Sequence, residues 1–155
     1  MRWDDLVSNE FWVRVGTALL CGFLVGLERQ LKGKPAGMRT SMLICLGTMV
    51  FVRLGVELGG NGADPTRVLG QVVTGIGFLG AGVILTREGI VVGITSAAAI
   101  WVLAAAGAAI GLDRPGMGLA ISGLTVVILV VVSTLERWFG SLRQGVHAET
   151  QDGRR

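Results

Sequence analysis

The stretch from residue 68 to residue 85 limits what this chain can fold into more than any other part of it. Its 18 residues carry no charge, and a helix of that length crosses the hydrocarbon core of a bilayer. The stretch also holds five glycines, each of which would destabilise a soluble helix by about 1 kcal/mol relative to alanine. In a membrane, glycines let neighbouring helices approach closely. We therefore predict a membrane-spanning helix over 68–85 and expect the other helices to pack around it.

The segment from Gly75 to Gly80 also matches the pattern G-x-G-x-x-G, which in soluble proteins can bind a dinucleotide. That pattern has this meaning only when it follows a strand and opens a helix. Here it lies inside an apolar run, so we interpret the glycines as helix-packing positions.

The composition agrees with a protein that crosses the membrane several times. Of the 155 residues, 51% are hydrophobic and only 16% are charged, whereas about a quarter are charged in an average soluble domain. The net charge of +3 does not indicate a nucleic-acid partner. Cys21 and Cys45 both fall in apolar stretches, where we expect small buried side chains rather than a disulfide or a zinc site.

Five apolar stretches predict an all-α fold, a bundle of about five transmembrane helices in contact with the lipid bilayer. A lead of residues 1–10 precedes them, and a short tail of residues 136–155 follows, too short for a second folded domain. The start of the chain lacks the basic region of a cleavable signal. The expected spans are 11–27, 40–58, 68–85, 89–112 and 117–135.

The distribution of basic residues predicts the orientation of the bundle. With the N-terminus outside and the C-terminus inside, nine of the 14 Lys and Arg residues lie on the inner side. Cytoplasmic loops are enriched in Lys and Arg. We therefore expect an N-out, C-in arrangement with the tail in the cytoplasm.

Ionisable residues at membrane depth are the first functional candidates because they are costly to bury. Five of them would gather at the inner ends of the first three spans, where they can form a network or serve as ordinary loop charges: Glu28, Arg29, Arg39, Arg87 and Glu88. Glu28 is the candidate Mg²⁺ ligand, because Mg²⁺ sites often use one or two carboxylates plus waters.

Polar and small residues inside the spans are the second group of candidates. Gln71 and Thr95 can hydrogen-bond between helices or, together with Glu28, form a polar cluster beside the glycine-rich helix. Arg53 and Glu57 can pair one turn apart, whereas Asp64 and Asp113 are expected to be solvated loop residues. The predicted helix-packing glycines are Gly22, Gly26, Gly75, Gly77, Gly80, Gly82, Gly107 and Gly111.

The sequence shows no constellation that would support catalysis. It has no H-E-x-x-H motif, no nucleophile elbow and no phosphate-binding Walker loop. We therefore expect that the chain is not an enzyme and carries no cofactor, with Mg²⁺ considered only as a ligand or a transported ion.

Several segments in this order and spacing resemble the signatures of the MgtC/SapB family. The resemblance runs from about residue 16 to 112, and its most specific parts are Pro-Ala-Gly-x-Arg-Thr and Gly-Ile-Gly-Phe-Leu-Gly-Ala-Gly. The matching segments are 26–30, 33–40, 71–85, 88–89 and 93–101. The positions that would carry the family's function are Glu28, Arg29, Pro35, Arg39, Gln71, Thr95 and Trp101.

The resemblance implies a multi-pass protein of the bacterial inner membrane with a cytoplasmic C-terminus. It also implies a link to growth at low Mg²⁺ and, in pathogens, to virulence through survival inside host cells. Some members are described as inhibitors of the F-type ATP synthase. Longer members carry a cytoplasmic domain that resembles ligand-binding ACT domains, and only about twenty residues follow the last span here.

Two functional hypotheses follow. In the first, the protein is a membrane regulator whose glycine-rich faces dock against a partner such as the F-type ATP synthase. In the second, it is an oligomeric Mg²⁺ or cation transporter or channel, because self-association would help a chain of this size to enclose a path.

Overall fold

The computed structural model describes residues 8–58, 64–87 and 90–139 of the chain. Glu88, the lead up to residue 7 and the tail from residue 140 lie outside the described residues.

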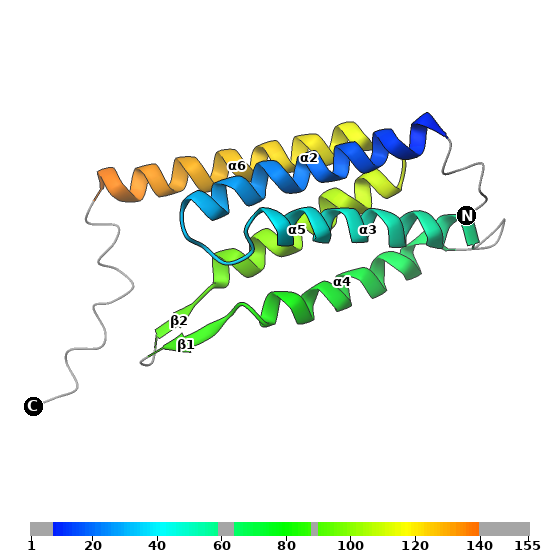
Figure 1. Cartoon of the computed structure of the whole chain (residues 1–155). Helices are drawn as coiled ribbons and strands as arrows, with labels where there is room; N and C mark the ends of the chain where they lie inside the picture. Colours follow the sequence, from blue (N-terminus) through cyan, green and yellow to red (C-terminus); the bar gives the residue numbers. More distant parts are fainter. Residues whose placement is uncertain (1–7, 59–63, 88–89, 140–155) are drawn as a thin grey trace, which may run out of the picture.

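Within the described residues, five helices run up and down beside one another, and a short hairpin joins two of them (Figure 1). The predicted all-α bundle is confirmed, and this hairpin is the addition to it. The elements are α2 (Asn9–Leu31), α3 (Met38–Leu58), α4 (Pro65–Ala81), β1 (Leu85–Arg87), β2 (Ile90–Val92), α5 (Ile94–Gly111) and α6 (Pro115–Trp138).

Four of these helices, α2, α3, α5 and α6, are long and apolar enough to cross a bilayer. Helix α4 has 17 residues, which is the lower limit for a membrane span.

Local sequence signals begin and end these helices. The side chain of Ser8 accepts a hydrogen bond from a backbone N–H in the first turn of α2, and Asp64 does the same for α4. Pro65 and Pro115 open α4 and α6, where a missing N–H does no harm. Just after α2, Gly33 has a φ of 62°, a left-handed conformation that ends a helix.

The hairpin corrects two of the expected spans. The helix predicted over 68–85 ends at Ala81, and the helix predicted over 89–112 begins only at Ile94. Between them, β1 pairs antiparallel with β2, with Thr86 opposite Val91. Several residues in this segment are β-branched, which favours strands over helices. Apolar character alone did not distinguish this short extended segment from the ends of two helices.

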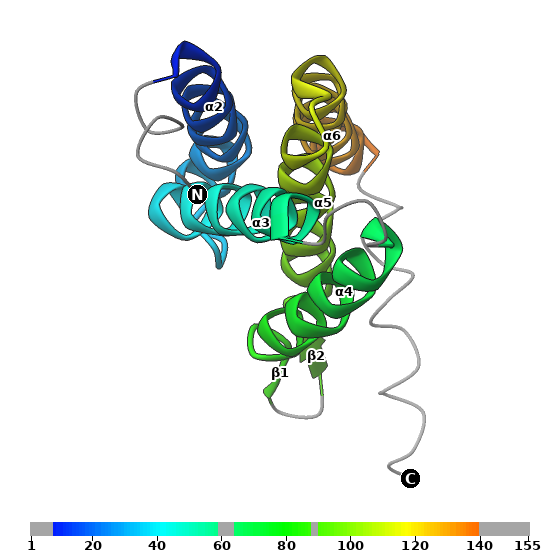
Figure 2. The same cartoon turned by 90° about the vertical axis from the view of Figure 1, so that its right-hand side faces the viewer.

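The central helix of the bundle is α5, so the prediction that 68–85 would be central was wrong. In Figure 2, α5 lies between α3, α4 and α6, while α4 lies at the edge of the bundle. More than half of the α5 residues are buried, whereas Ile76 is the buried large side chain of α4. Helix α5 is alanine-rich and apolar on all sides, and a helix of this kind is buried in the interior.

The core is filled by two clusters of apolar side chains, and α5 contributes to both. The first joins α2, α3 and α5 through Ala18, Cys21, Cys45, Met49, Ala106 and Ile110. The second includes α4 and consists of Val25, Ile44, Ile76, Ile100, Leu103 and Ala104. Both cysteines are free and buried, as expected.

Candidate functional site

A cavity opens at the end of the bundle that carries the hairpin, which we call the hairpin end. It has a volume of about 800 Å³ and is lined by α2, the hairpin, the start of α5 and the C-terminal half of α6. In Figure 1 these parts lie at the same end of the molecule. The charged residues of the lining are Glu28, Arg29, Lys32, Lys34 and Glu136. We call this space the hairpin-end cavity.

Glu28 is held by a lysine one turn later. Its side chain is 7% exposed, and Oε1 lies 2.5 Å from Lys32 Nζ. Lys32 also donates hydrogen bonds to the Leu129 carbonyl oxygen at 2.9 Å and to Ser133 Oγ at 2.5 Å. Lys32 therefore neutralises a buried carboxylate and ties α2 to α6.

This pair bears on the suggestion that Glu28 binds Mg²⁺. No group of three or more His, Cys, Asp or Glu side chains that could hold a metal ion occurs among the described residues. A lysine ammonium already lies in ion-pair contact with Oε1, although neither carboxylate oxygen has a hydrogen bond of good geometry within the described residues. The role of Glu28 as a magnesium ligand stays a prediction.

Arg29 is also buried, with 4% of its surface exposed. One of its terminal nitrogens donates a hydrogen bond to Ser96 Oγ in the first turn of α5, and its Nε has no partner among the described residues. Thr95 lines the same cavity. Thr95, which is far from Glu28 and Arg29 in the sequence, therefore lies beside them in the structure.

Gly93 allows the start of α5 to lie close to the segment that leads into the hairpin. It precedes α5 with a φ of 97°, a conformation that glycine adopts without strain. A Cβ atom at this position would lie 2.0 Å from the carbonyl oxygen of Val83. Only glycine therefore fits between the hairpin and α5.

The other predicted polar candidates do not join this cluster. Gln71 lines a different pocket, so the proposed cluster of Glu28, Gln71 and Thr95 was wrong for Gln71. Arg39 is exposed near the start of α3. Arg87 is in β1, and Glu88 is outside the described residues.

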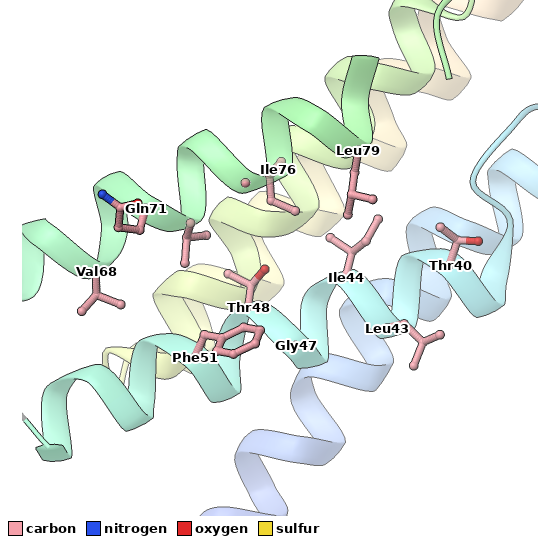
Figure 3. Close-up of a pocket in the computed structure, with 12 residues that line it drawn as sticks. Thr40, Leu43, Ile44, Gly47, Thr48, Phe51, Val68, Gln71, Ile76 and Leu79 are labelled. Atoms are coloured by element: carbon pink, nitrogen blue, oxygen red, sulfur yellow. The ribbon is translucent and has the colours of Figure 1, made fainter. Parts of the chain in front are cut away.

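The pocket that contains Gln71 is an apolar groove of about 620 Å³ between α3 and α4. Figure 3 shows Ile44, Thr48 and Phe51 of α3 facing Val68 and Ile76 of α4 across it. Gly47 and Gly75 belong to its lining, and a Cβ atom at either position would have nothing within 4 Å. We call this the α3–α4 groove.

The predicted packing glycines divide into two groups. At four of them a Cβ atom would lie within 2.7 Å of a backbone atom of α3: Gly22, Gly26, Gly107 and Gly111. Gly75 and Gly77 face open space, and Gly80 and Gly82 make only looser contacts. Of the predicted packing glycines, those in close helix contacts are therefore the ones that join α3 to α2 and to α5.

A network of ion pairs joins the helices at the opposite end of the bundle. Arg53 pairs with Glu57 at 2.5 Å, as predicted. Asp113 was expected to be a solvated loop residue, but it lies 2.6 Å from Arg14 and 2.8 Å from Arg53. Asp113 thus links α2 and α3 to the turn before α6.

Sequence reasoning missed the roles of Lys32, Ser96 and Asp113. The spacing of Glu28 and Lys32, four residues apart in one helix, was a signal that they could pair. Nothing in the sequence pointed from Asp113 to arginines more than fifty residues away, because that contact depends on how the helices are arranged.

A family model and the sequences of known relatives agree on the family that this chain resembles. The family model described as "MgtC family" matches residues 15–138. The chain is 42% identical over 137 residues to a protein of Escherichia coli named "Putative magnesium transporter YhiD", covering 83% of this chain and 63% of that protein. It is 36% identical over 139 residues to "Protein MgtC" of Brucella abortus, covering 86% of this chain and 56% of that protein.

A third relative is "Protein SrpB" of Synechococcus elongatus, which is 37% identical over 137 residues, covering 80% of this chain and 75% of that protein. The match thus spans less than two thirds of the length of the Escherichia coli and Brucella relatives. No solved structure matches the chain.

Proposed function

The chain belongs to the MgtC family, and from this premise we propose that it is a regulator of magnesium homeostasis in the bacterial inner membrane. It acts without enzymatic chemistry, by contact between its helices and those of a partner protein. The membrane sector of the F-type ATP synthase is the first partner to test, because the family resemblance implies it.

The observation that carries this proposal is the open α3–α4 groove. Its apolar walls include Phe51 and Leu43, each 67% exposed, and its glycines have room for added atoms. Transmembrane helices associate through small residues that let backbones approach closely. Helix α4 is thus a peripheral helix with glycine positions available to a neighbour.

The packing at the centre of the bundle favours a regulator over a channel within one copy. A Cβ atom at Gly22 would lie 2.5 Å from the α3 backbone, and one at Gly107 would lie 2.4 Å from it. Helices at this separation leave no room for a hydrated ion, and the side chains around them are apolar. An ion path through a single chain would have to open this contact.

The test compares two substitutions on the same helix. Gly75→Leu fills the α3–α4 groove, whereas Gly70→Leu places the same side chain in open space outside the groove lining. We expect Gly75→Leu to abolish co-purification of the ATP synthase from cross-linked inner membranes, and Gly70→Leu to retain it. ATP-driven proton pumping should be inhibited in membranes with wild type or Gly70→Leu and restored with Gly75→Leu. Equal behaviour of the two variants would remove the groove from the proposal.

The second candidate function is an oligomeric Mg²⁺ transporter. It is favoured by the buried Glu28 carboxylate with its unpartnered Oε2 in the hairpin-end cavity, and by the name of the Escherichia coli relative. Liposomes with purified protein should then take up Mg²⁺ across a range of membrane potentials. Flux lost in Glu28→Gln would place Glu28 on the path, and no flux from correctly folded protein would exclude this function.

A further inference from the structure

Arg29 forms no close ion pair with a carboxylate among the described residues, although the charge of Glu28 acts on it. Its neighbour Glu28 is paired with Lys32 at 2.5 Å, and Arg29 donates a hydrogen bond to the uncharged hydroxyl of Ser96. Its Nε is buried without a hydrogen-bond partner in the described part of the chain. A buried charge is normally paired and its donors are normally satisfied, so this guanidinium is suited to an anion that approaches from the cavity.

The start of α5 offers a second, independent group of donors. The first backbone N–H groups of a helix have no partner within the helix and carry a partial positive charge. No side chain caps this helix of 18 residues. The residue at the capping position is Gly93, where any Cβ atom would collide with Val83, so no Ser, Thr or Asp can take the place of an external acceptor.

These two groups of donors lie together. The hydrogen bond from Arg29 to Ser96 holds the guanidinium against the first turn of α5. Arg29, Thr95 and Ser96 all line the hairpin-end cavity, which at about 800 Å³ has room for a ligand. Lys32 and Lys34 line it as well, so its basic residues outnumber its acidic ones, Glu28 and Glu136.

We propose that the hairpin-end cavity binds a phosphate group at the junction of Arg29 and the N-terminus of α5. A phosphate has several acceptor oxygens, so it can accept from the Arg29 guanidinium, from hydroxyl groups and from the helix amides at the same time. This site is separate from the α3–α4 groove and does not depend on the proposed function.

The phosphate group can come from a free ion or from a lipid. Lys34 is exposed on the cavity lining, and Ile128 and Val132 of α6 form an apolar wall with about half of their surface exposed. A phospholipid headgroup could therefore sit on Arg29 with its acyl chain along α6. Inorganic phosphate would use the same donors without the apolar wall.

The experiment measures heat unfolding of the full chain in an uncharged detergent. One arm adds inorganic phosphate, with sodium chloride at equal ionic strength as its control. The other arm adds phosphatidylglycerol, with diacylglycerol, which lacks the phosphate, as its control. The variants are Arg29→Gln, which removes the guanidinium, and Arg39→Gln, which removes an exposed arginine outside the cavity lining. Ser96→Ala serves where Arg29→Gln does not fold.

Stabilisation of wild type and Arg39→Gln by phosphate beyond chloride, with affinity weakened about tenfold or more in Arg29→Gln or Ser96→Ala, supports a site for the free ion. The same pattern with phosphatidylglycerol alone supports a lipid phosphate. The proposal is overturned if neither anion stabilises the protein more than its control. It is also overturned if the stabilisation persists undiminished in both Arg29→Gln and Ser96→Ala.

Discussion

Replacement of Gly107 with alanine tests how closely α5 approaches α3. The added Cβ atom would lie 2.4 Å from the carbonyl oxygen of Cys45 and 3.0 Å from the Cβ atom of Thr48. Non-bonded heavy atoms prefer separations of about 3.5 Å or more, so the two helices must move apart by about 1 Å. The obstacle is a backbone oxygen, which no change of side-chain rotamer can move.

The magnitude follows from two opposing effects. Overpacking of a tight contact costs about 1–3 kcal/mol, and the upper part of this range applies because the backbone must shift. Alanine also favours a helix over glycine by about 1 kcal/mol. We therefore expect Gly107→Ala to lower the free energy of unfolding by about 2 kcal/mol.

The matched control is Gly75→Ala, which makes the same chemical change in open space. It should leave the free energy of unfolding unchanged or raise it by up to about 1 kcal/mol. Unfolding in detergent can be followed by circular dichroism and by a thiol-reactive dye, because Cys21 and Cys45 are both free and fully buried. If Gly107→Ala proved as stable as Gly75→Ala, the close α3–α5 contact and the reasoning built on it would be refuted.

Three further predictions concern charged groups. Asp113→Asn should lower stability by about 1 kcal/mol at low salt and by less at high salt, because two half-exposed ion pairs are lost; salt-dependent unfolding measures this. Lys32→Met should cost about 3 kcal/mol in unfolding free energy, since it leaves the buried Glu28 carboxylate unpaired. Glu28→Gln should cost less, because Lys32 is 29% exposed and still reaches water and α6; equal losses would contradict this. Hydrogen bonds from the Thr66 hydroxyl and backbone N–H lower the pKa of Asp64. Thr66→Ala should raise that pKa in an NMR titration. In the wild type, the stability contributed by this cap is present above the ordinary pKa of aspartate. It is lost as the pH falls through the lowered pKa.

Two residues of the hairpin-end cavity could be predicted from the sequence, because their selection required only the cost of burying a charge. Glu28 and Arg29 were chosen because charges at the end of a membrane span are costly and need a reason to be there. The structure places both of them in one cavity with Thr95. The partner of Arg29 was not predictable, because Ser96 reaches Arg29 only through the packing of α5 against α2.

The glycines also show what could not be predicted from the sequence. Their number marked the chain as a bundle of closely packed helices, but not which glycines would be in contact. Gly75 and Gly77 belong to the most glycine-rich stretch and face open space, whereas Gly107 and Gly111 lie against α3. The size of a side chain limits how closely two helices can approach. The rotation of each helix about its axis decides which of its residues face the neighbouring helix.

The sequence by itself determined the class of this protein and the approximate positions of its long apolar helices. A long uncharged stretch is a local property of the chain, so its effect is visible in the sequence. Only the tertiary structure decided that α5 is central, that a hairpin interrupts the predicted spans and that Asp113 joins two arginines. These features arise from contacts between residues far apart in the chain, and such contacts depend on the relative rotation and order of helices that are nearly uniform in hydrophobicity.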